Sequence, residues 1–238
     1  MSRSRRGGGR TRTPRGSAAK RDQVRLKTAR GRKASSTRWL SRQLNDPFVA
    51  RAKKAGYRSR AAFKLTELDD RFRFLRAGAR VVDLGAAPGG WTQVAVERAG
   101  RGNVIAVDVS PMDPVAGALV VSADILDGSA IKTILGATER GVDVVLSDMA
   151  PASTGHRSTD HLRIVALAEA AFDVACRILR PHGVFVAKVY QGGSERELLA
   201  AMKAAFRMVK HAKPVASRRE SAETYVIAVD FRQSGFEA

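Results

Sequence analysis

The sequence predicts an α/β domain in which a mostly parallel, seven-stranded sheet carries helices on both faces. From residue 80 onward, short apolar and β-branched segments alternate with longer amphipathic ones, a pattern typical of βαβ units. A glycine-rich turn follows the first apolar segment, as in folds that bind nucleotides. Acidic residues stand at the ends of several of these segments, at the edge of a parallel sheet where ligands bind.

Each element is placed by its local pattern. The expected strands are residues 80–84, 103–107, 119–122, 142–147, 183–189, 207–210 and 224–229. The expected helices between them run to about residue 98 after the glycine turn and then cover residues 128–137, 161–179 and 194–205. Two more helices precede the first strand: one opens at Asp46-Pro47, and the next begins near Arg58 with Ser59 as a candidate cap.

Length and composition limit the class of protein. The chain has 238 residues, 44% of them hydrophobic, enough for one sizeable core plus an extension. It has no apolar run near the roughly 20 residues that span a bilayer, and its basic start lacks the apolar region of a secretory signal. The single cysteine, Cys176, excludes an internal disulfide and lies in an apolar helical pattern. We therefore expect a buried thiol and a cytoplasmic protein.

The positive charge is concentrated in the first quarter of the chain. Of a net charge of +19, residues 1–60 contribute 20 lysines and arginines against two acids, while residues 61–238 are nearly neutral. Residues 1–36 hold almost nothing to bury and are expected to form a disordered basic arm. The distribution indicates a polyanionic partner, although a tail that only aids solubility is the alternative.

The glycine turn has the spacing G-x-x-x-G-G, from Gly85 through Pro88 to Gly89 and Gly90. It is not the dinucleotide fingerprint G-x-G-x-x-G. Glycines allow close approach to the backbone, and the free N–H groups of the following helix face a ligand bound there. Gly85, Pro88 and Gly89 are therefore candidate cofactor-binding residues, although a tight structural turn is the alternative.

Four acids fall at, or just past, the end of an expected strand and are candidate cofactor-binding residues: Asp83, Asp108, Asp124 and Asp148. Asp108 stands where nucleotide-binding folds place a carboxylate on the ribose hydroxyls, and Asp124 suits an adenine amino group; capping is the alternative role of both. An acidic rim disfavours a pyrophosphate and favours a cationic adenosine ligand, so S-adenosyl-L-methionine is the expected cofactor. The histidines show no metal-ligand spacing, and no metal site is expected.

Several further segments occur together in the order of one known family. They are Arg38-Trp39-Leu40, residues 56–65, residues 83–91, residues 147–151, residues 186–188 and a pattern over residues 213–225. Over residues 37–231 the chain resembles the FtsJ-type ribosomal RNA 2′-O-ribose methyltransferases, specifically their bacterial large-subunit members. The resemblance implies a Rossmann-like class I methyltransferase domain over residues 37–238, with RNA-contact residues in helices within residues 37–78. It also implies a uridine of 23S rRNA as the target. Nothing demands a dimer, so a monomer is expected.

The resemblance also assigns individual residues. The family's catalytic Lys-Asp-Lys-Glu tetrad falls on Lys64, Asp148, Lys188 and Glu223. The family's cofactor contacts fall on Gly89, Trp91, Asp108 and Asp124, and Asp148 borders the sulfonium.

The chemistry of the reaction suits these residue types. A ribose 2′-hydroxyl is a poor nucleophile until its proton is drawn off, and a positioned base and in-line alignment both lower the barrier. Our hypothesis is that Lys188 is the base, that Asp148 orients it, and that Lys64 and Glu223 position the ribose. On their own, Lys64 could be a solvated surface charge, and Glu223 could be a charge that keeps an edge strand from pairing with another chain. Lys188 closes an apolar strand, where a charge is costly.

Three other functions compete with this hypothesis. The target could be a transfer RNA or a small-subunit ribosomal RNA. The chain could be a non-enzymatic ribosome-assembly factor that keeps the fold and the basic arm, although an intact tetrad argues against this. A nicotinamide-dependent dehydrogenase is disfavoured because the pyrophosphate fingerprint is missing.

Overall fold

The computed structural model describes residues 34–126, 129–138, 141–151, 154–190 and 196–232. The chain divides into two units, Met1–Asp46 and Pro47–Ala238. In the first unit, helix α1 (Ala34–Leu44) carries Arg42 in its last turn. Residues 34–36, which we expected to belong to the basic arm, are the start of α1, and residues 1–33 lie outside the described residues.

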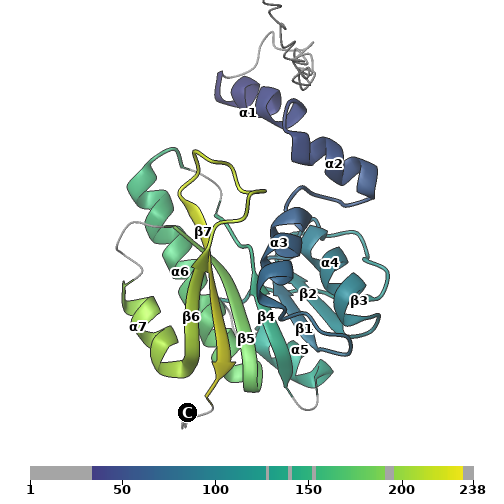
Figure 1. The fold of residues 1–238 in the computed structure, drawn as a ribbon, viewed down its shortest axis with the longest axis vertical. Coiled ribbons are helices and arrows are strands. Elements are labelled where there is room, and N and C mark those ends of the chain that lie inside the picture. Colours follow the sequence, from purple (N-terminus) through teal and green to yellow (C-terminus); the bar gives the residue numbers. More distant parts are fainter. Residues whose placement is uncertain (1–33, 127–128, 139–140, 152–153, 191–195, 233–238) are drawn as a thin grey trace, which may run out of the picture. The chain divides into compact units, whose positions relative to one another are not determined.

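Seven strands of the second unit form one sheet in the order β3-β2-β1-β4-β5-β7-β6 (Figure 1). They are β1 (Val81–Leu84), β2 (Val104–Asp108), β3 (Ala118–Ser122), β4 (Val142–Ser147), β5 (Leu179–Tyr190), β6 (Phe206–Ala212) and β7 (Glu223–Phe231). The pairs from β3 through β5 are parallel, and β7 is antiparallel to both of its neighbours. The prediction of a mostly parallel, seven-stranded sheet is confirmed.

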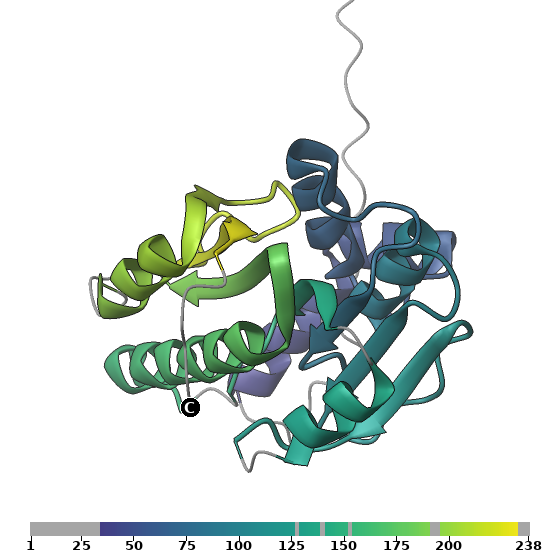
Figure 2. The same ribbon diagram turned by 90° about the horizontal axis from the view of Figure 1, so that it is seen from below.

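Helices cover both faces of this sheet, as Figure 2 shows from the end of the strands. The covering helices are α3 (Ala62–Phe72), α4 (Gly90–Ala99), α5 (Ser129–Ala137), α6 (Arg157–Ile178) and α7 (Arg196–Ala205), while α2 (Pro47–Ala55) precedes them and contacts α3. Because successive strand residues point to opposite faces, Val82 packs with α5, α6 and α7 while Val81 packs with α3 and α4. Among the described helices, none has the length and apolar character needed to cross a membrane.

The strand register brings several chain segments to one rim of the sheet. Leu84 pairs with Val107 on one side and with Ser147 on the other. The residues that follow these strands therefore emerge together at the carboxyl end of the parallel strands. Because β7 runs antiparallel to β5, with Glu223 opposite Tyr190, the start of β7 lies at this same rim.

Two expected boundaries differ from those observed. We expected β5 to begin at residue 183, but it begins at Leu179, because Val142 pairs with Leu179 and Val144 with Val184. The register shift leaves residues 180–183 as a bulge, with His182 at a φ of 68°. The second difference is at α3, which begins at Ala62 with Ala61 as its N-cap and no side-chain cap bond. The prediction that Ser59 caps this helix is wrong, because residues 58–61 form a turn.

Candidate active site

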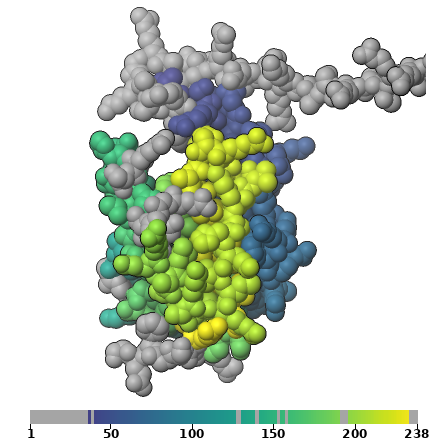
Figure 3. Space-filling model, turned by 60° about the vertical axis from the view of Figure 1, so that its left-hand side comes forward, coloured from purple at the N-terminus to yellow at the C-terminus, as the bar shows by residue number. Residues whose placement is uncertain are grey.

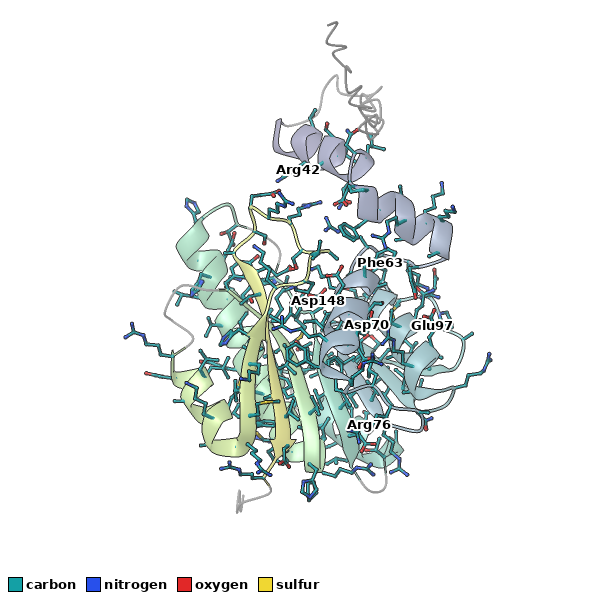
Figure 4. All side chains as sticks on the ribbon, in the orientation of Figure 1. Arg42, Phe63, Asp70, Arg76, Glu97 and Asp148 are labelled. Carbon is teal, nitrogen blue, oxygen red and sulfur yellow. The ribbon has the colours of Figure 1, made fainter. Side chains whose placement is uncertain are left out.

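Four charged side chains converge at the carboxyl end of the parallel strands, where Figure 4 labels Asp148. The Lys188 ammonium lies 3.0 Å from Oδ1 of Asp148 and donates a 2.6 Å hydrogen bond to the Asp148 carbonyl. The Lys64 ammonium lies 2.8 Å from Oε1 of Glu223 and 3.8 Å from Oδ2 of Asp148. The side chains are 6% to 16% exposed, so these charges interact with little screening by water. The structure thus brings all four tetrad residues together.

Strand geometry explains this convergence. Lys188 of β5 pairs directly with Tyr225 of β7, and residues opposite each other point to the same face. Glu223 is two residues from Tyr225 and therefore shares that face. Lys64 reaches the group from α3, whose neighbouring residue Leu65 is fully buried in the core.

Tyr225 is a member of this cluster that the sequence reasoning did not assign to the site. Its hydroxyl donates a 2.7 Å hydrogen bond to Oδ1 of Asp148 and accepts one of 3.0 Å from the Lys64 ammonium. Its ring is fully buried and lies 5.6 Å from the ring of Trp91. The available signal was its position two residues after Glu223 in an expected strand, which predicts that both side chains point to one face.

The charges of the cluster stabilise one protonation state. Burial alone would raise the pKa of Asp148, but the ammonium groups of Lys188 and Lys64 outweigh burial and hold the pKa below its ordinary value. Burial, together with the carboxylates of Asp148 and Glu223, keeps the pKa of Tyr225 well above its ordinary value. Asp148 is therefore an ionised acceptor at neutral pH, and Tyr225 remains a hydroxyl donor.

A cavity of about 750 Å³ lies beside the tetrad. Its lining includes three carboxylates that stand at strand ends and residues of the glycine turn. These are Asp108, Asp124 and Asp148, and Gly85 and Ala87, with Met149 beside them. Backbone N–H groups fix two of the carboxylates. Asp108 accepts from Ala87 at 2.9 Å and from Ser110 at 2.7 Å, and Asp124 accepts from Leu126 at 2.9 Å.

The chemistry of this lining suits a cationic adenosine ligand. Three carboxylates face the cavity, and Val107, Ile125 and Leu126 add apolar surface. Such a wall attracts a sulfonium and an ammonium group and disfavours a pyrophosphate. Because Asp148 lines the cavity and also contacts Lys188, a ligand in the cavity would lie directly beside the proposed base.

The glycines of the turn have protein atoms as their close neighbours. A side-chain carbon at Gly90 would lie 2.2 Å from the Ser59 hydroxyl oxygen. At Gly89, where φ is 105°, it would lie 3.1 Å from the Arg58 guanidinium and 3.0 Å from Val115. We expected these glycines to admit a ligand. The described contacts show that Gly89 and Gly90 also admit residues 58–59 and the loop that follows β2, while Gly85 lines the cavity. Cofactor contacts from the turn stay a prediction.

Four of the expected cofactor residues lie outside the cavity's lining as given by the described residues: Asp83, Pro88, Gly89 and Trp91. Trp91 is 3% exposed and donates from Nε1 to the Ala61 carbonyl at 2.8 Å. It thereby fixes the start of α3, the helix that carries Lys64. A direct cofactor contact from any of these four residues stays a prediction.

Asp83 is a buried carboxyl group beneath the glycine turn. It accepts a 2.7 Å hydrogen bond from the Thr92 hydroxyl, and its Oδ1 has no hydrogen-bond partner among the described residues. Burial, together with the nearby carboxylates of Asp148 and Asp108, raises the pKa of Asp83 to about 7, although the Thr92 hydrogen bond opposes the rise. In the described part of the chain, no group of three or more His, Cys, Asp or Glu residues could hold a metal ion.

Comparison with known proteins places this site in a family. Residues 57–231 match the model of the FtsJ-like methyltransferases. The chain belongs to this family. It is 57% identical to a protein of Gluconobacter oxydans named ribosomal RNA large subunit methyltransferase E, over 88% of this chain and 78% of that one. It is 54% identical to a protein of the same name from Granulibacter bethesdensis, over 97% of this chain and 99% of that one.

The match to the Granulibacter bethesdensis protein covers 97% of this chain and therefore includes most of residues 1–36. The match to the family model begins only at residue 57. Among solved structures, a protein from Plasmodium falciparum described as a ribosomal RNA methyltransferase has a TM-score of 0.66 at 27% identity, over 74% of this chain and 98% of that one. A hemolysin-like protein from Lactococcus lactis, at 16% identity and a TM-score of 0.51, shares the fold alone.

Proposed function

We propose that this protein uses S-adenosyl-L-methionine to methylate the ribose 2′-hydroxyl of a uridine in the 23S ribosomal RNA of the large ribosomal subunit. The observation that carries the proposal is the double role of Asp148, which lines the cavity and holds the Lys188 ammonium. Family membership and the names of the relatives support the same reaction and the same RNA.

The cavity residues have distinct roles toward the cofactor. S-adenosyl-L-methionine, when bound, supplies the methyl group on a positively charged sulfur. Asp108 would accept the ribose hydroxyls, and Asp124 would accept the adenine amino group. The Asp148 carboxylate would face the positive sulfur. Gly85 forms the wall beside them and has no room for a side chain, because such a carbon would lie 2.2 Å from Met149.

The tetrad activates the nucleophile. Once its ammonium has lost a proton to solvent, the neutral Lys188 amine would take the proton of the 2′-hydroxyl as its oxygen attacks the methyl carbon. The electron pair of the breaking carbon–sulfur bond returns to sulfur, which leaves as a neutral thioether. Asp148 holds Lys188 through two hydrogen bonds, at 2.6 and 3.0 Å, so the base has one fixed position. The Lys64–Glu223 pair would position the ribose, and the Tyr225 hydroxyl joins Lys64 to Asp148.

The RNA would approach over the first part of the chain. In the second unit, α2 presents exposed Arg51, Lys53 and Lys54, and the Arg51 guanidinium stacks on the rings of Phe48 and Phe63 at 5.1 and 4.6 Å. Phe63 and Lys64 both belong to α3, so bases or phosphates bound at Phe63 would lie at the same helix that carries a tetrad residue. The protein would act as a monomer in the cytoplasm, where ribosomal subunits are assembled.

Mapping of 2′-O-methyl groups tests this proposal. Ribosomal RNA from a strain that lacks the gene is compared with RNA from strains complemented by the wild type, by Lys188→Ala, or by Lys203→Ala. Lys203 is an exposed lysine of α7 and serves as the control. We expect one methylated uridine of 23S rRNA to return with the wild type and the control only. A site that returns in tRNA or 16S rRNA, or no site at all, would contradict the proposal.

A further inference from the structure

Residues Arg58, Ser59 and Arg60 lie against the glycine turn and contact two loops that belong to different halves of the site. The backbone N–H of Arg58 donates to Oε1 of Gln93 at 2.8 Å, and Nε2 of Gln93 donates to the Gly56 carbonyl at 2.9 Å. Ser59 fills the space above Gly90. The backbone of this segment is therefore fixed on α4, so the side chains of its two arginines begin at fixed positions.

Arg58 holds the cofactor-side loop, residues 109–117. Its Nη1 donates to the Asp113 carbonyl at 2.6 Å and to the Pro88 carbonyl at 3.2 Å, and its Nη2 donates to the Pro114 carbonyl at 2.6 Å. One guanidinium thus joins the glycine turn to the far part of the loop. Charged donors make the stronger class of hydrogen bond, and a planar fork suits two adjacent carbonyls.

The cofactor-side loop is a wall of the cavity. Val109 and Ser110 line it, and the Ser110 N–H fixes Oδ1 of Asp108. Further along, Val115 is 6% exposed and packs over Gly89. A shift of this loop would therefore move both the cavity wall and the carboxylate expected to bind the ribose of the cofactor.

Arg60 holds the catalytic-side loop, residues 213–222, which contributes to the face shown in Figure 3 together with β6. Its Nη2 donates to the Ala216 carbonyl. The Ala216 N–H is held by the Glu67 carboxylate at 3.2 Å, and the next residue, Ser217, donates a 2.8 Å hydrogen bond to Oε1 of Glu223. Arg60 thus acts on the loop that orients a tetrad residue.

We propose that residues 58–60 form a two-sided clip in which Arg58 is a positioning residue for the cofactor and Arg60 a positioning residue for Glu223. An arginine in so basic a segment would ordinarily be assigned to RNA phosphates. The geometry favours the clip, because both terminal nitrogens of Arg58 donate to backbone carbonyls. The inference rests on the proposed function, since it takes S-adenosyl-L-methionine as the ligand of the cavity.

The test measures the two sides separately in the full-length protein. Isothermal titration with S-adenosyl-L-methionine, without RNA, gives the cofactor Kd, and hydrogen exchange reports on residues 109–117 and 213–222. We expect Arg58→Ala to raise the cofactor Kd about tenfold and to speed exchange in the 109–117 loop only. Arg58→Lys keeps the charge without the fork and should give a smaller rise. Arg60→Ala should leave the cofactor Kd within about twofold, speed exchange in the 213–222 loop, and lower kcat.

The outcomes separate the clip from its alternatives. An unchanged cofactor Kd and unchanged exchange in Arg58→Ala, together with weaker RNA binding, would overturn the clip and make Arg58 a phosphate contact. If Arg58→Ala does not fold, then Gln93→Ala, which releases the backbone of residue 58, and Arg58→Lys decide by the same two readouts. If the wild type binds no S-adenosyl-L-methionine, the proposed function fails, and the loop exchange rates still decide whether the clip exists.

Discussion

The Lys188 ammonium contacts Asp148 twice, at the side-chain Oδ1 and at the main-chain carbonyl of the same residue. One acidic residue therefore fixes both the direction and the distance of the lysine. The two groups come from adjacent parallel strands, β5 and the end of β4. Their placement thus depends on the sheet register and not on a flexible loop.

Replacing Lys188 by Ala should reduce methyl transfer by about 100- to 10,000-fold, the range that a positioned base contributes. Cofactor Kd should stay within about threefold, because Lys188 is not among the described residues that line the cavity. Single-turnover methylation of 23S rRNA and calorimetric titration measure the two quantities. Full turnover in the variant would remove Lys188 from the reaction, and Lys203→Ala serves as the charge-matched control.

Replacing Tyr225 by Phe should lower kcat by about 10- to 100-fold while the protein stays folded. The change removes the hydroxyl between Lys64 and Asp148 but keeps the ring against Trp91. The loss of one partner of a buried charged group costs about 1–3 kcal/mol, which sets this range. Tyr57→Phe removes a hydroxyl bonded to Glu97 on α4 and is the matched control. Equal kcat values for the two variants would show that the Tyr225 hydroxyl is not needed.

Replacing Asp83 by Asn should stabilise the protein at pH 8.5 and have little effect near pH 4. In the folded protein the pKa of Asp83 is about 7, whereas an unfolded aspartate titrates near pH ~3.9. Between these values the folded state binds the extra proton, so wild-type stability falls as pH rises from about 4 to 7. The full difference is on the order of 4 kcal/mol.

Urea denaturation of both proteins at several pH values measures this effect. The expected gain for Asp83→Asn grows with pH and levels off above pH 7, where the folded wild type carries the buried charge. Asp113→Asn, a change at an exposed position of the 109–117 loop, should show no such trend. A gain that is the same at every pH would mean that Asp83 does not titrate in this range.

Deleting residues 1–33 should weaken binding to the large ribosomal subunit and flatten its salt dependence. These residues carry 13 lysines and arginines against one acid, and each cation that neutralises a phosphate adds to the slope of log K against log salt. Cofactor Kd should not change. Identical affinities and slopes for the full and shortened chains would show that this region does not contact the RNA.

Sequence reasoning reached the sheet through short-range rules and the tetrad through the motif order of the family. Alternation of apolar segments placed the seven strands, and acids after those strands predicted a shared rim that now contains Asp108, Asp124 and Asp148. Lys188 was identifiable because a charge that closes an apolar strand needs a partner. Its partner, Asp148, came from the motif order of the family.

Other features depended on contacts between distant segments. Nothing local to Trp91 indicates that its N–H donates to the Ala61 carbonyl, and the family resemblance gave it only a cofactor contact, which stays a prediction. The bulge at residues 180–183 depends on the pairing of β4 with β5, which a single strand's pattern does not contain. The close neighbours of Gly89 and Gly90 include Arg58, Ser59 and Val115, which are distant in the sequence, and the glycines alone do not indicate these contacts.

The antiparallel strand β7 lies between β5 and β6 and begins with Glu223. During synthesis, a chain that has not yet extended past this strand has no fourth tetrad residue and no partner for β6. Translation must therefore pass this strand before the active site can be completed. A stop codon upstream of it would yield a product with no residual activity.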